Sequence, residues 1–98
     1  MPNYPISDFR EYFHEIRTTI RSETYYMAGR IARMAKSAYR KGGFSAVAST
    51  LERYANENRW RLTAEAILQN CDNWRYAIRD LEFAARLAND YKHRRSKS

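Results

Sequence analysis

The sequence predicts an all-α protein: a small elongated helical bundle of three to four helices with a long C-terminal helix, in one domain over residues 1–98. Apolar residues recur at three- and four-residue steps along most of the chain, and the alternation of β-branched residues typical of strands is absent. Only 3 glycines and 2 prolines interrupt this pattern. A chain of 98 residues, 44% of them hydrophobic, is sufficient for one core and short for two.

The first helix is expected to begin at Ser7, whose side chain is a preferred N-cap. Pro2 and Pro5 favour an extended conformation for residues 1–6, and Asp8 would then lie in the first turn, where an acid favours the helix dipole. An aromatic apolar stripe continues to about residue 21. It consists of Phe9, Tyr12, Phe13, Ile16 and Ile20.

A second helical pattern follows, with Met27, Ile31, Met34 and Ala38 on one face. The joint at residues 18–24 is polar and β-branched, and it allows two interpretations. One is a continuous helix with a phase slip, and the other is a break after which Ser22 caps the second helix.

The Gly42-Gly43 pair predicts the clearest boundary, because glycine readily adopts the positive φ found just beyond the C-terminus of a helix. Ser45 can cap a third helix, which is expected to fray at residues 56–58. The apolar residues of this short helix are Val47, Ala48, Leu51, Tyr54 and Ala55.

The last helix is predicted from Thr63 to Lys92, with a break at Asp72 as the alternative and a basic flexible tail at 93–98. Its apolar seam follows heptad spacing: Ala64, Ile67, Cys71, Trp74, Ile78, Leu81, Ala85 and Ala88. A helix of about 30 residues is about 45 Å long, which exceeds the size of a compact chain of this length. Either the earlier helices fold back along the seam, or another chain covers it. A homo-oligomer would use Ile67, Cys71, Trp74, Ile78 and Leu81.

Several functional classes are disfavoured by the sequence. Cys71 is the single cysteine, and no secretory signal or apolar run long enough for a membrane span occurs, so we expect a cytoplasmic protein. Glu11 and His14 have the spacing of a carboxylate-bridged metal site, but such sites need two copies of the pair. No glycine-rich phosphate loop is present. We therefore expect no enzymatic activity, no cofactor and no metal.

Charge distribution gives the first candidate site. The formal net charge is +7, and 14 of the 18 basic residues are arginines, which pair with phosphates and carboxylates through two parallel hydrogen bonds. At 100° per residue, Arg33, Lys36 and Arg40 lie opposite the apolar face of the second helix. The predicted basic binding residues are Arg30, Arg33, Lys36, Arg40 and Lys41 in this helix and Arg94 and Arg95 in the tail. The alternative is an ordinary solvated face.

Aromatic residues beside arginines give the second candidate site: Tyr25, Tyr26, Tyr39, Arg59, Trp60 and Arg61. Exposed rings of this kind anchor protein interfaces or stack on bases, whereas buried ones are core residues. The expected function is a non-enzymatic inhibitor, adaptor or assembly factor that binds a larger acidic protein or nucleoprotein through these Arg- and Tyr-rich surfaces. The alternative is a helical protein that binds nucleic acid through its phosphates.

Overall fold

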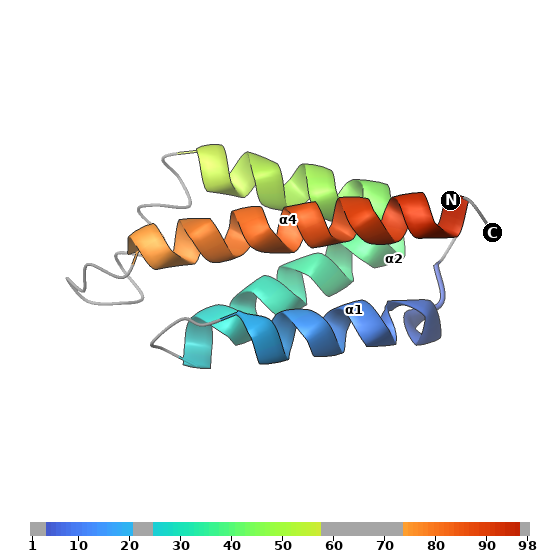
Figure 1. The fold of residues 1–98 in the computed structure, drawn as a ribbon, viewed down its shortest axis with the longest axis horizontal. Coiled ribbons are helices and arrows are strands. Elements are labelled where there is room, and N and C mark those ends of the chain that lie inside the picture. Colours follow the sequence, from blue (N-terminus) through green and yellow to red (C-terminus); the bar gives the residue numbers. More distant parts are fainter. Residues whose placement is uncertain (1–3, 21–24, 58–73, 97–98) are drawn as a thin grey trace.

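The computed structural model describes residues 4–20, 25–57 and 74–96, and all three stretches are helical for most of their length. The helices are α1 (Ile6–Thr19), α2 (Tyr25–Asn56) and α4 (Trp74–Ser96) (Figure 1). No strand occurs in these three stretches. The radius of gyration is 13.2 Å and the principal extents are 44 × 24 × 18 Å, so the predicted all-α, elongated bundle is confirmed.

The two glycines divide α2 into two helical rods. Gly42 (φ −154°, ψ 20°) and Gly43 (φ 68°, ψ −160°) leave the helical conformation, and the chain reverses direction between residues 25–41 and 44–56 (Figure 1). We call these rods the first and second segments of α2. The backbone conformation of Gly43 is one that only glycine adopts without strain. The boundary predicted at this pair is therefore confirmed.

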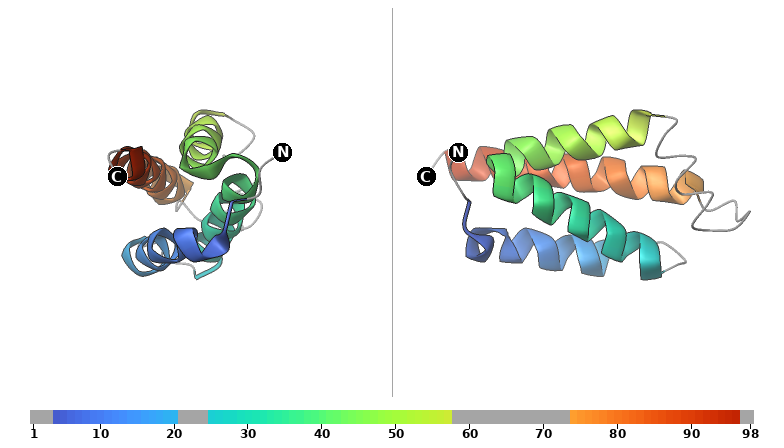
Figure 2. Two further views of the ribbon diagram at one scale, coloured as in Figure 1. Left: turned by 90° about the vertical axis from the view of Figure 1, so that its right-hand side faces the viewer. Right: turned by 180° about the vertical axis from the view of Figure 1, so that it is seen from behind.

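The four rods form a bundle in which consecutive rods are antiparallel (Figure 1). Seen end-on in Figure 2, the first segment of α2 lies between α1 and the second segment, and α4 closes the bundle on the opposite side, packed chiefly against α2. The earlier helices thus fold back along the C-terminal helix, which is the first of the two predicted alternatives. Leu81 is 0% exposed within one chain. Leu81 and Ile78 therefore pack within one chain, whereas Ile67, Cys71 and the Trp74 side chain lie outside the described part of the chain, so the homo-oligomer stays a prediction.

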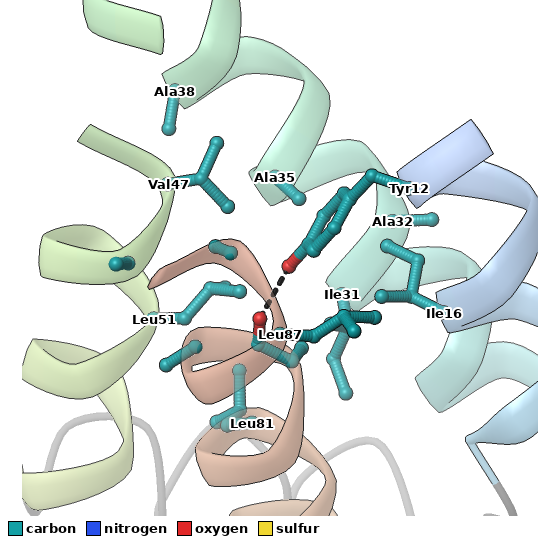
Figure 3. Packing of buried hydrophobic residues seen from close by; sticks show 14 of the residues in the cluster. Tyr12, Ile16, Ile31, Ala32, Ala35, Ala38, Val47, Leu51, Leu81 and Leu87 are labelled. Carbon is teal, nitrogen blue, oxygen red and sulfur yellow. Dashed lines mark hydrogen bonds between the residues drawn. The ribbon is translucent and has the colours of Figure 1, made fainter. Parts of the chain in front are cut away.

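The core is aliphatic at its centre and aromatic at one end. Tyr12, Ile16, Ile31, Leu51 and Leu81 are fully buried and meet from all four rods (Figure 3). At the end near the Gly42-Gly43 reversal, neighbouring ring centroids lie 4.9 to 6.2 Å apart. This cluster contains Phe9, Tyr12, Tyr39, Phe44 and Tyr91. Such tilted ring pairs add stability beyond the area that they bury.

Three predicted helix ends differ from the structure. The N-cap of α1 is Pro5 rather than Ser7, and no side chain caps the helix, because the Asp8 amide donates instead to the Pro5 carbonyl at 3.1 Å. The helix stops at Thr19, where Ile20 is extended, so the break is the correct alternative. The predicted tail is wrong for residues 93–96, which continue α4 to Ser96. The predicted start at Thr63 and the alternative break at Asp72 lie outside the described residues.

The end of the second segment agrees with the prediction, since α2 stops at Asn56. None of the helices in the described stretches is both long enough and apolar enough to span a bilayer.

Candidate functional site

The outer face of the first segment of α2 carries a stripe of cations. Arg33, Arg40 and Lys41 are exposed, whereas Arg30 and Lys36 are half-buried at its edges. No Asp or Glu occurs between residues 24 and 51 of the sequence. Within its own helix segment the stripe therefore has no acid at the three- and four-residue spacing that pairs charges on an ordinary solvated helix face.

Helix α1 extends this stripe with Arg10, Phe13 and Arg17. Steps of three and four residues place these three side chains on one face of the helix. The Arg17 Cζ lies 5.8 Å and the Lys36 Nζ lies 5.9 Å from the centre of the Phe13 ring. Arg17 also reaches α2, where its Nη1 is 3.8 Å from the position that a Cβ on Gly29 would take. The two helices thus share one set of cations around Phe13.

Three connected hollows follow these cations across the surface. A hollow of about 170 Å³ between α1 and α2 is lined by Ile6, Phe9, Arg10, Phe13 and Lys36. A shallow depression of about 440 Å³ begins at Lys36 and continues along Arg33, Ser37, Arg40 and Lys41. A third hollow of about 310 Å³ shares Ser37 and Lys41 and reaches Thr50, Arg53 and Tyr54 on the second segment of α2. Among the described residues, no acid lines any of the three.

We call this surface the cationic face. Its charged members are Arg10, Arg17, Arg33, Lys36, Arg40, Lys41 and Arg53. Each end contains a half-buried aromatic ring near a cation: Phe13 at one end and Tyr54 at the other, where the Arg53 Cζ lies 5.9 Å from the ring centre. Glu57, one turn after Arg53, is exposed and is the first acid that follows the Tyr54 end in sequence.

The opposite flank of α1 is acidic and faces α4. Glu15 accepts a hydrogen bond of 2.7 Å from the Tyr91 hydroxyl. Burial, the hydrogen bond to Glu15 and the charges of Glu15 and Glu11 together raise the pKa of Tyr91 to about 12, although Arg94 acts to lower it. Arg94 lies over the same ring, with its Cζ 5.0 Å from the ring centre. The cations at the end of α4 are therefore close to acids, whereas the first segment of α2 contains no acid.

Two other surfaces have a mixed character. A hollow of about 650 Å³ along α4 is lined by Arg86 and His93 together with Asp90, Asn89 and apolar Phe83 and Leu87. A hollow of about 320 Å³ beside the Gly42-Gly43 reversal is lined by both Asp8 and Lys92. In the described residues, no group of three His, Cys, Asp or Glu side chains is placed to hold a metal ion. The cationic face is thus the surface with the most uniform charge.

The structure separates the residues predicted from sequence to bind a partner. Arg33, Lys36, Arg40 and Lys41 lie together, with Arg30 at their margin. Arg94 lies on α4, over the ring of Tyr91, whose hydroxyl is bonded to Glu15. Tyr39 is 2% exposed within the aromatic cluster, so its prediction as a binding residue is wrong. Other predicted positions lie outside the description: residues 59–61, and the side chains of Tyr25, Tyr26 and Arg95.

Sequence reasoning missed five members of the cationic face: Phe13, Tyr54, Arg10, Arg17 and Arg53. Phe13 and Tyr54 were counted in apolar stripes, although both are only half-buried. Arg10 and Arg17 were not connected with the second helix, because the packing of α1 against α2 is a tertiary contact. Their spacing of three and four residues around Phe13 was the available signal.

Comparison with known proteins gives no relative: no family model, no curated protein and no solved structure matches the chain. The function is therefore inferred from the surface alone.

Proposed function

We propose that this protein is a non-enzymatic binding protein that holds nucleic acid by its phosphate backbone through the cationic face. The observation that supports this proposal is the run of seven cations on α1 and both segments of α2, with no acid among the described residues that line the hollows. A phosphate backbone presents charges at regular intervals, and neutralising them releases condensed counterions. A continuous row of cations suits such a ligand.

An acidic protein surface is the competing partner, because the composition is rich in arginine and tyrosine, as protein interfaces are. Burial of Tyr39 removes one of the predicted aromatic anchors of such an interface. The large hydrophobic side chains that are exposed in the described residues are Tyr4 and Tyr76, and neither lines the cationic face. The rings that do line it, Phe13 and Tyr54, are half-buried at its two ends, so charge dominates its centre, which favours the nucleic acid.

The test compares two variants with the same change in net charge. The first removes three cations from the cationic face (Arg33→Gln, Lys36→Gln and Arg40→Gln). The second removes three exposed cations from α4 (Arg79→Gln, Arg86→Gln and Arg94→Gln). Binding to a fluorescent oligonucleotide is measured by anisotropy over a series of salt concentrations. If all seven cations contact phosphates, the slope of log K against log salt is about −5 for a single strand, and the first variant reduces its magnitude by about 2.

The α4 variant is expected to keep the slope and the affinity of the wild type. Equal losses in both variants would show that total charge, and not the cationic face, determines binding. An oligonucleotide affinity no higher than that for polyglutamate of equal length would overturn the proposal in favour of an acidic protein partner.

A further inference from the structure

We infer that the nucleic acid bound by the cationic face is single-stranded, with one base stacked on Phe13 and another on Tyr54. This inference depends on the proposed function, because it specifies the ligand of the same surface. The two rings lie in hollows on either side of the first segment of α2, and the cations of that segment lie between them. Alternation of rings and cations is typical of surfaces that bind single strands.

The Phe13 end combines an apolar floor with a charged rim. Phe9 is 1% exposed and forms the floor, and its ring centre lies 5.9 Å from that of Phe13. Arg10 and Lys36 form the rim of the 170 Å³ hollow. Arg17 lies one helical turn after Phe13 on α1, with its Cζ 5.8 Å from the centre of the Phe13 ring. A flat aromatic base fits against such a wall, while its flanking phosphates meet the rim.

The Tyr54 end repeats this arrangement with different residues. Met34 and Ala38 supply apolar contacts in the 310 Å³ hollow, and Lys41 and Arg53 supply the charges. Because Lys41 also belongs to the depression along the first segment of α2, the charges continue from one ring to the other. Thr50 and Ser37 add hydroxyl groups that are able to donate hydrogen bonds to phosphate or base.

The cations now near the rings do not prevent stacking. They lie 5.8 to 5.9 Å from the ring centres, close to the limit of about 6 Å for a cation–π contact. Such exposed contacts are weak, and long flexible side chains exchange them readily for a phosphate. A duplex keeps its bases stacked inside, so it gains only the phosphate contacts and nothing from the rings.

The experiment measures the wild-type protein with three oligonucleotides of about 12 nucleotides: oligothymidylate, an abasic strand with the same backbone, and a mixed-sequence duplex. Oligothymidylate is expected to bind about tenfold or more tightly than the abasic strand. The variants Phe13→Leu and Tyr54→Leu keep apolar packing and all charges. Each variant is expected to bind oligothymidylate about tenfold more weakly. Its affinity for the abasic strand and the salt slope are expected to stay unchanged. Tyr76→Leu, at an exposed ring on α4, is the matched control and is expected to change neither.

The outcomes separate this inference from the proposed function. Equal affinity for oligothymidylate and the abasic strand overturns stacking while the salt dependence still supports phosphate binding. Equal affinity for the duplex and for oligothymidylate would also overturn stacking and leave phosphate binding supported. If the protein binds none of the oligonucleotides more tightly than it binds polyglutamate, both proposals are overturned. The comparison of ligands uses the unmodified protein, so the test stands even if a leucine variant fails to fold.

Discussion

The Tyr12 hydroxyl donates a hydrogen bond of 2.5 Å to the main-chain carbonyl of Ala84, which joins α1 to α4 across 72 residues of sequence (Figure 3). Tyr12 is 0% exposed, so this bond is made in the centre of the core. Burial, and then the nearby Tyr91 and Glu15, raise the pKa of Tyr12 far above that of an ordinary tyrosine. The hydroxyl therefore remains a neutral donor throughout the physiological range.

Replacing Tyr12 with Phe keeps the ring and removes this donor. We expect the free energy of unfolding to fall by about 1 to 2 kcal/mol, because the Ala84 carbonyl loses a partner in a buried place. Urea denaturation followed by circular dichroism measures the change. Tyr76→Phe, at a ring that is 49% exposed, is the control and should be neutral. Equal stabilities for the Tyr12→Phe variant and the wild type would show that the bond contributes nothing.

High pH should unfold the protein through its buried tyrosines. The pKa of Tyr91 rises to about 12 from an ordinary value of 10.0, chiefly by burial. A raised folded pKa means that the contribution of Tyr91 to stability is complete below pH 10 and is lost as the pH rises toward 12. Tyrosinate absorbance and helical circular dichroism should therefore change together in this range. Glu15→Gln should lower the pKa of Tyr91, because a neutral amide replaces the charged hydrogen-bond acceptor. An unchanged titration in that variant would contradict the role of Glu15.

Asp80 should make the protein less stable as the pH rises through mild acidity. Burial raises the pKa of Asp80 from 3.8 to about 6, and its buried Oδ2 has no hydrogen-bond partner in the described structure. The protonated form is therefore favoured on folding, and this contribution is lost between about pH 4 and pH 6. Asp80→Asn should raise stability at pH 7 by about 1 kcal/mol after allowance for solvent screening, and should be neutral at pH 4. Thermal melts at both pH values test this, with exposed Asp90→Asn as the control.

The glycines should respond to alanine substitution in opposite directions. At Gly43 the φ of 68° is unfavourable for alanine, and the new Cβ would lie 3.0 Å from the Tyr4 ring, so we expect a loss of about 1 to 3 kcal/mol. Gly29 is helical, and its new Cβ would make an ordinary contact with Arg17 at 3.8 Å. Gly29→Ala should stabilise the protein by about 0.5 to 1 kcal/mol. Denaturation curves of the two variants measure both changes in the free energy of unfolding. An unchanged stability for Gly43→Ala would contradict the described reversal.

The sequence predicted the helical rods well because the apolar spacing that indicates a helix lies within each segment. Apolar spacing identified all four rods, and the Gly42-Gly43 pair located the reversal. Helix ends were less accurate, as Ser7 and the residues after Lys92 show, because a capping side chain competes with main-chain bonds of similar strength.

The candidate site was only half predictable from sequence. The α2 cations follow from the phase of one helix, and Arg33, Lys36 and Arg40 do share a face. The contribution of Phe13 and Arg17 depends on which flank of α1 packs against α2, and the burial of Tyr39 depends on its contacts with Phe9 and Phe44. These relations arise between segments, so no periodicity within one segment reveals them.

The two flanks of α1 also have a kinetic consequence. Acids face α4 and cations face α2, so the cations of α1 and the first segment of α2 lie together on one side of a narrow molecule, whereas the exposed cations of α4 lie among acids. An electric field from an approaching polyanion exerts a torque on such a charge distribution and turns the cationic side toward the polyanion before contact. Fewer collisions then occur in the wrong orientation, and the association rate becomes faster and more sensitive to salt than for an even distribution of the same net charge.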